Sequence, residues 1–218
     1  PDIDQNDLTI ALSVFGFVAF LIFSNFGYLQ RPFEREVEAK ITEVITTSVT
    51  GLEYILGKIF GLGTVMLAQV SVWLGVNALI FGGNRFTLDV ELVAWPLLLV
   101  SVGFALLGYL LYSGIFLTVL SLLPSYINPN QINFLLVVLL IAPAVGILFI
   151  ITNPQSATAV GLTIFPLTAP FLMPMRLIVA PVPIWQSLVS FVLLLVSTYA
   201  ALQLSAYTFK MRAPHMRQ

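Results

Sequence analysis

Long apolar runs separated by short polar segments dominate the sequence. Five of these runs are long enough to cross a bilayer, because a spanning helix needs about 20 mostly apolar residues. They cover residues 8–29, 59–81, 92–123, 132–151 and 184–209. The third run exceeds one crossing, so its helix is tilted, broken near Gly103 or extended into the interface. The pattern predicts an all-α polytopic membrane bundle that forms a single transmembrane domain over residues 1–218.

A transmembrane β-barrel is the competing class of membrane fold. Barrel strands alternate apolar and polar residues over about ten positions, whereas residues 134–140 and 188–196 are apolar on every face. The composition excludes a water-soluble domain, since 59% of the residues are hydrophobic and 9% are charged. Residues 92–175 contain no Asp, Glu, Lys or Arg at all. Helices that pair their own backbone groups are the remaining solution in lipid.

Between the fourth and fifth spans, residues 153–183 have a different texture. This segment is apolar but is interrupted by six prolines, at positions 154, 166, 170, 174, 181 and 183. Each proline removes a backbone donor and disfavours a continuous helix. We expect short helices that lie on, or dip into, one membrane face. The alternative is an ordinary long loop packed on the bundle.

Residues 30–61, which we call the charged segment, hold five of the ten acidic residues and four of the nine basic ones. From Phe33 to Ile45, apolar residues recur at helical spacing, and the charged residues lie on the opposite face. Pro32 stands where a helix commonly begins, and Gly51 stands where one ends. The pattern predicts an amphipathic helix over residues 32–50 that lies along the membrane surface. The alternative is a solvated connector without a partner.

Basic residues indicate the orientation of the bundle. The tail after the fifth span holds three Lys or Arg residues, and the charged segment holds four. With five spans both segments lie on the same side, which the positive-inside rule assigns to the cytoplasm. We therefore expect a cytoplasmic C-terminus and an extracytoplasmic segment over residues 153–183.

Several kinds of chemistry are excluded by composition. The chain has no cysteine, and its single histidine, His215, lies in the C-terminal tail. Thiolate metal sites, a Ser–His dyad and a haem ligated within the membrane therefore cannot be built. The net charge of −1 argues against a nucleic-acid partner. No phosphate-binding G-x-x-x-x-G-K-[ST] motif occurs, so we predict no catalytic residue, metal or cofactor in this chain.

Three short stretches resemble those of a known family. Glu36, Glu38, Lys40 and Glu43 are followed by the hydroxyl-containing run 44–48 and by a Gly-Lys pair within residues 56–61. Residues 165–176 repeat proline at four-residue spacing before an arginine, and residues 108–112 read GYLLY. In this order the stretches resemble the type 2 ABC export permeases, specifically their sodium-efflux-like branch. The chain differs from that pattern at Val37, where Lys is usual, and at Lys40, where Arg is usual.

The resemblance implies the transmembrane half of an ATP-driven exporter in the plasma (inner) membrane. Its ATPase would be a separate subunit, and the second half would be another copy or a related chain, both halves embedded in lipid. The helix after the first span would dock on the ATPase, and the proline-rich segment would form an extracytoplasmic gate. The implied docking residues are Glu36, Glu38, Lys40, Glu43, Thr47, Ser48 and Gly51. The implied gate residues are Pro166, Pro170, Pro174 and Arg176.

Small residues in the second span predict a close helix contact. Gly57 and Gly61 are four residues apart, and Gly63 lies beside them. Such spacing lets two backbones approach closely, although small residues are common in membrane helices in general.

Two other functions compete with export. A permease-derived subunit that stabilises a larger membrane complex would have non-transport membrane proteins as its stable partners. A secondary carrier would be driven by an ion gradient, but the spans carry no charged residue for one. Family members usually have an earlier span and an extracytoplasmic domain, and this sequence begins at Pro1. We therefore expect it to be a piece of a longer protein.

Overall fold

A computed structural model describes residues 4–38, 49–81, 95–122 and 129–215. The described part is helical and contains no strand, which confirms the predicted all-α class. The helices are α1 (Gln5–Glu38), α3 (Gly51–Phe81), α4 (Trp95–Leu122), α5 (Pro129–Thr152), α6 (Ala157–Ile164), α7 (Ala169–Val179) and α8 (Ile184–His215). Within the described residues, two stretches are long and apolar enough to cross a membrane, Leu99–Leu122 and Ile184–Met211. Shorter apolar helical stretches are Asp7–Phe23, Val138–Thr152 and Ala169–Val179.

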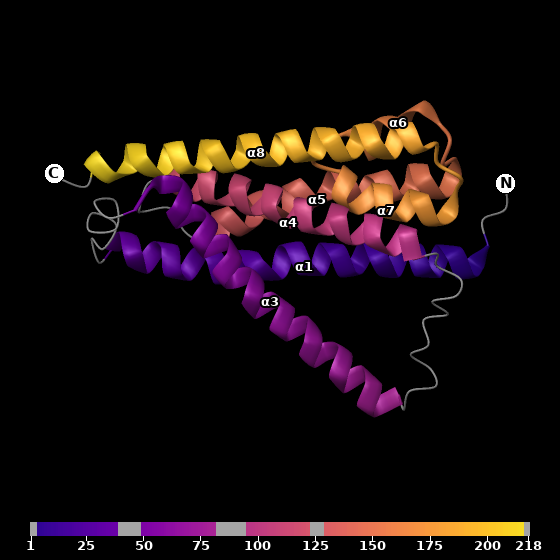
Figure 1. The fold of residues 1–218 in the computed structure, drawn as a ribbon, viewed down its shortest axis with the longest axis horizontal. Coiled ribbons are helices and arrows are strands. Elements are labelled where there is room, and N and C mark those ends of the chain that lie inside the picture. The colour runs from indigo at the N-terminus through magenta and orange to yellow at the C-terminus, as the bar shows by residue number, and fades with distance from the viewer. Residues whose placement is uncertain (1–3, 39–48, 82–94, 123–128, 216–218) are drawn as a thin grey trace.

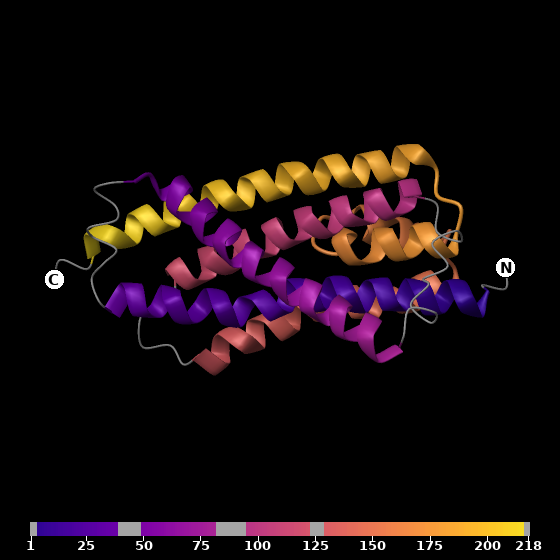
Figure 2. The same cartoon turned by 60° about the horizontal axis from the view of Figure 1, so that its bottom comes forward.

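The long helices run along a common axis, and Figure 1 shows α4 between α8 and α1. Helix α3 begins beside the end of α8 and slants away from the other helices. We call the end where α1 and α8 finish and α3 begins the Gly51 end. The opposite end, where α5 meets α6 and α7 meets α8, we call the Arg176 end. Turned by 60°, Figure 2 shows the same opposed ends, with the start of α1 and the end of α8 far apart.

Helix α1 does not end at the predicted boundary between a first span and a surface helix. It continues without a break through Pro32 to Glu38. A proline in a membrane helix is tolerated where the freed backbone groups find other partners. Residues 32–38 therefore extend the first helix, and residues 39–48 of the predicted surface helix lie outside the described part.

Helix α4 is the central element of the core. It passes Gly103 as an unbroken helix of 28 residues, so the predicted long third run is one extended helix. At Gly114 the backbone of α8 comes so close that an added Cβ would lie 3.2 Å from the Ala201 carbonyl carbon. Small residues at such a crossing let the two helix backbones pack closely. In lipid this packing drives helix association, because there is no hydrophobic driving force between the helices.

Helices α6 and α7 form a hairpin that enters the bundle from the Arg176 end. The first eight residues of α7 are all buried, although the segment is rich in proline. At the hairpin turn, Tyr112 from the middle of α4 donates a hydrogen bond to the Leu167 carbonyl at 2.6 Å. The 8 residues of α6 rise about 12 Å, so the turn lies about that far from the start of the hairpin.

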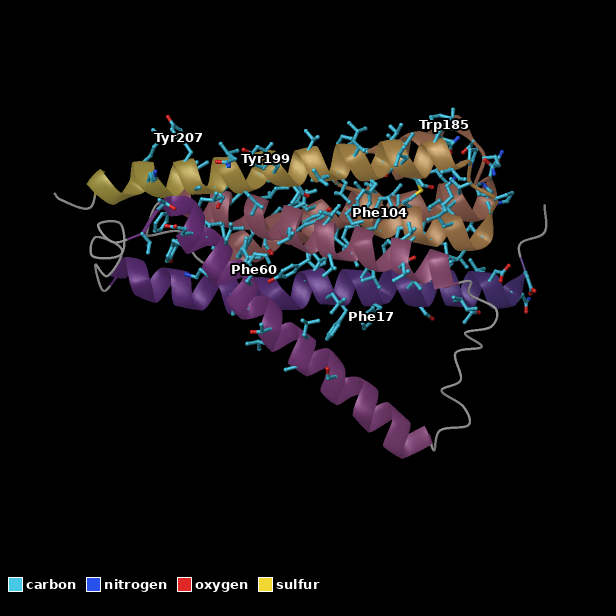
Figure 3. All side chains as sticks on the ribbon, viewed as in Figure 1. Phe17, Phe60, Phe104, Trp185, Tyr199 and Tyr207 are labelled. Carbon is cyan, nitrogen blue, oxygen red and sulfur yellow. The ribbon has the colours of Figure 1, made fainter. Side chains whose placement is uncertain are left out.

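One face of α8 is suited to lipid. Leu188, Val192 and Leu195 are exposed on this helix, although they are apolar. Trp185 and Tyr207 are also exposed, and Figure 3 shows them pointing away from the bundle near the two ends of α8. They are 22 residues apart, about 33 Å along a helix, which matches the spacing of aromatic side chains at the two interfaces of a bilayer.

Gly108 on α4 is expected to tolerate no side chain. An added Cβ would lie 2.4 Å from Cβ of Pro170 at the start of α7, and the proline ring cannot rotate away. Gly108→Ala should therefore destabilise the protein by about 1–3 kcal/mol through overpacking. Thermal unfolding in detergent measures this loss. Gly61→Ala is the matched control, because nothing lies within 4 Å of its added Cβ. Equal midpoints for the two variants would contradict the packing described.

Candidate functional site

The Arg176 cluster is the most distinctive polar group in the described part of the chain. Arg176 is fully buried near the end of α7. Its Nε donates to the Pro154 carbonyl at 2.7 Å, and one terminal nitrogen donates to Gln186 Oε1 at 2.8 Å and to Thr163 Oγ1 at 3.2 Å. The other terminal nitrogen donates to Gln155 Oε1 at 3.1 Å. One side chain therefore ties together the α5–α6 loop, α6, α7 and α8.

The four acceptors of Arg176 are all neutral. In the sequence, Arg176 is also the only charged residue between Glu91 and Lys210. Its charge is therefore hydrogen-bonded but is not neutralised by a carboxylate in the described part of the bundle. A buried charge is tolerated only when its donors are satisfied, so each acceptor is costly to remove.

Two further hydrogen bonds join the segments around Arg176 to one another. Gln155 Nε2 donates to the Pro181 carbonyl at 2.7 Å, so this amide holds both Arg176 and the segment before α8. Ser190 on α8 is fully buried and donates to the Thr163 carbonyl of α6 at 2.7 Å. The start of α8 is thereby bound to both helices of the hairpin.

The turn between α6 and α7 satisfies its backbone groups with partners from the protein itself. Thr168 Oγ1 donates to the Leu162 carbonyl, and the backbone amides of Thr168 and Ala169 donate to the Phe165 carbonyl. The Tyr112 hydroxyl serves the Leu167 carbonyl. Non-helical backbone is stable within a membrane only under such cover.

At the opposite end, α3 begins with a capping box. The Thr50 backbone amide donates to the Glu53 carboxylate at 2.8 Å, and the Glu53 amide donates to Thr50 Oγ1 at 3.3 Å. The hydrogen bonds from the Thr50 backbone and hydroxyl hold the pKa of the exposed Glu53 carboxyl below its usual value. The box fixes where α3 starts, directly after residues 39–48.

The first turns of α3 pack closely on the end of α8. A Cβ on Gly51 would lie 2.9 Å from the Ala206 carbonyl oxygen, so the two backbones are nearly in contact. The Tyr54 ring stacks on the buried Phe209 ring with centroids 4.3 Å apart and planes at 15°. Lys58 Nζ donates to the Tyr54 hydroxyl at 3.0 Å.

The predicted docking residues lie around the Gly51 end as far as the structure describes them. Glu36 and Glu38 are in the last turn of α1, and Gly51 opens α3. The remaining four predicted docking residues lie outside the described part, and they are Lys40, Glu43, Thr47 and Ser48. Residues 39–48 therefore lie in the sequence between two helices, and the end of α1 and the start of α3 are at the same end of the bundle (Figure 1).

The predicted gate residues lie together in the hairpin. Pro166 is in its turn, and Pro170, Pro174 and Arg176 are buried on α7. The structure adds partners that the sequence did not connect with Arg176, namely Gln155, Thr163 and Gln186. The signal for them was the isolation of Arg176 itself, since a lone buried charge requires polar neighbours.

Other glycines make the close contacts within this chain. Gly57 and Gly61 have nothing within 4 Å of an added Cβ, while Gly63 faces the Tyr109 hydroxyl at 3.5 Å. The tight approaches are at Gly51, Gly103, Gly108, Gly114 and Gly146. A contact of Gly57 and Gly61 with a second chain stays a prediction.

Comparison with known protein families gives a match over most of the chain. The family model described as ABC-2 family transporter protein matches residues 4–207, which include α1 and most of α8. The chain belongs to this family. Membership confirms the resemblance to type 2 ABC permeases and identifies the helical bundle as a membrane permease domain.

The permease is also similar to an uncharacterized protein of Methanocaldococcus jannaschii. The two are 24% identical over 197 residues, which cover 90% of this chain and 48% of the relative. The permease thus spans about half the length of that protein. No solved structure matches it.

Removal of one acceptor from Arg176 is expected to destabilise the permease. Gln186→Leu leaves a guanidinium N–H without its 2.8 Å partner, which should cost about 1–3 kcal/mol. Gln203→Leu is the matched control, because Gln203 is exposed on the same helix. Thermal or denaturant unfolding in detergent compares the two variants. If both are as stable as the wild type, Gln186 does not hold Arg176.

Proposed function

We propose that this chain is the permease half of an ATP-driven ABC exporter. ATP is hydrolysed by a separate subunit, and the substrate leaves across the plasma membrane. The family match supports the permease assignment, and the resemblance to the sodium-efflux-like branch favours export.

The observation that carries the proposal is where the helices on either side of the connection between α1 and α3 lie. The end of α1 and the start of α3 are both at the Gly51 end of the bundle, and in the sequence residues 39–50 connect them. An ATPase bound to this connection would hold the ends of two long helices at once. The capping box at Thr50 and Glu53 and the contact of Gly51 with α8 make the start of α3 a firm point of attachment.

The charges of the chain support an orientation with the Gly51 end in the cytoplasm. The end of α8 carries Lys210, and Lys58 lies on the second turn of α3. The Arg176 end, with the α6–α7 hairpin, then faces outward. In this orientation the hairpin closes the outer end of the bundle and serves as the gate.

The docking assignment rests on residues on both sides of the connection. We propose that Glu36, Glu38, Lys40 and Glu43 contact the ATPase together with Thr47, Ser48 and Gly51. A second permease half, either another copy or a related chain, would complete the transporter.

Copurification and ATP turnover test the proposed function. The chain should copurify with an ATPase that contains a phosphate-binding loop. Glu43→Ala or Lys40→Ala should lower the ATP turnover of the complex about tenfold or more, because a charged docking contact typically contributes 1–3 kcal/mol. Asp7→Ala is the matched control, since Asp7 lies at the opposite end of α1. Absence of such an ATPase, or equal turnover in all three variants, would contradict the proposal.

A further inference from the structure

Helix α8 makes close contacts at both functional ends of the bundle. It runs unbroken for 32 residues, from Ile184 to His215. Between Ile184 and Arg212 its sequence contains neither glycine nor proline. Helices without these residues rarely kink, so α8 transmits a displacement along its axis as a rigid rod.

At the Gly51 end, α8 lies directly against the start of α3. Because a Cβ on Gly51 would already be 2.9 Å from the Ala206 carbonyl oxygen, α3 cannot approach α8 without displacing it. The stacked rings of Tyr54 and Phe209 add a broad contact one turn further along α3. A shift of the α3 start at Gly51 therefore reaches α8 within one turn of α3.

At the Arg176 end, α8 holds both helices of the hairpin. Gln186 binds Arg176 of α7, and Ser190 binds the Thr163 carbonyl of α6. Gln186 and Phe209 are 23 positions apart, which is about 35 Å along the helix. A movement of the rod by a fraction of one turn changes these two hydrogen bonds.

The long contact of α8 with α4 permits such a movement. Of the buried threonine and serine hydroxyls along it, Thr118, Ser121 and Thr208 donate to carbonyls of their own helices. Thr198 donates to Leu194 of its own helix at 2.8 Å and reaches across to the Leu107 carbonyl at 3.3 Å. Of these four hydroxyls, Thr198 is the one whose bond to the other helix a shift of α8 along α4 would break.

From these contacts we infer that α8 couples the two ends of the permease. Displacement of the α3 start by the ATPase moves α8, and α8 loosens or tightens the Arg176 cluster that holds the α6–α7 hairpin. Gly51, Tyr54 and Phe209 act as positioning residues at one end of the rod, and Gln186 and Ser190 at the other. The inference rests on the proposed function, because it requires an ATPase at the Gly51 end.

A single reporter cysteine tests the coupling in the complete permease–ATPase complex in lipid vesicles. The chain has no cysteine of its own, so Ser190→Cys places one thiol at the buried contact between α8 and α6. Trapping the ATPase with ATP and vanadate should change the maleimide labelling rate of this thiol at least about fivefold. Added to this background, Gly51→Ala should reduce that response, because its new methyl group clashes with α8.

Gly16→Ala on α1 is the matched control, since its added Cβ meets nothing within 4 Å. It should keep the full response to nucleotide. Equal responses of the Gly51→Ala and Gly16→Ala proteins would overturn the inference. A labelling rate that does not change on trapping, while a bound ATPase hydrolyses ATP, would also overturn the inference. The proposed function would stand in that case. If no ATPase binds, both fail.

A second measurement applies if Gly51→Ala does not fold. Coupling between two sites is reciprocal, so a change at the Arg176 end must alter nucleotide affinity at the ATPase. Gln186→Leu should shift the nucleotide concentration for half-maximal vanadate trapping about fivefold or more, and Gln203→Leu on the same helix should not. Equal values for these two variants would overturn the inference.

Discussion

A guanidinium removed from water needs acceptors for its protons, and in this permease that need organises one end of the bundle. Arg176 is buried, has no carboxylate beside it in the described part, and bonds to four neutral oxygens. Those oxygens come from a loop, from α6 and from α8. Because an unsatisfied buried charge is far more costly than an ordinary lost hydrogen bond, the four segments are held in one arrangement.

The same requirement explains how a proline-rich segment can enter the bundle. Non-helical backbone inside a membrane bundle must find donors from the protein itself. Thr168 and Tyr112 supply them at the turn, and Gly108 provides the space in which Pro170 can approach α4. The hairpin is therefore anchored twice, by hydroxyl groups at its turn and by Arg176 near its open end.

Much of this fold follows from the sequence, because apolar length and proline spacing are local properties. Where the structure describes them, the five apolar runs lie in helices, and the six prolines mark where the short helices α6 and α7 form. Periodicity did not reveal that α1 continues through Pro32, since two helical patterns in succession look alike whether the helices are joined or bent. Nor could spacing separate Gly61, which is open, from Gly108, which is in tight contact. The partners of Arg176 lie up to 22 residues away and depend on how the helices pack.

Together these contacts describe a permease with a defined cluster at each end and one rigid helix between them. The central claim is that Arg176 holds the hairpin in the bundle. Hydrogen–deuterium exchange in lipid nanodiscs tests it most directly, by comparing Arg176→Leu with the wild type. Backbone amides of α6 and α7 should exchange about 100-fold faster in the variant, while those in the middle of α4 keep their protection. Unchanged protection of α6 and α7 in the variant would contradict the claim.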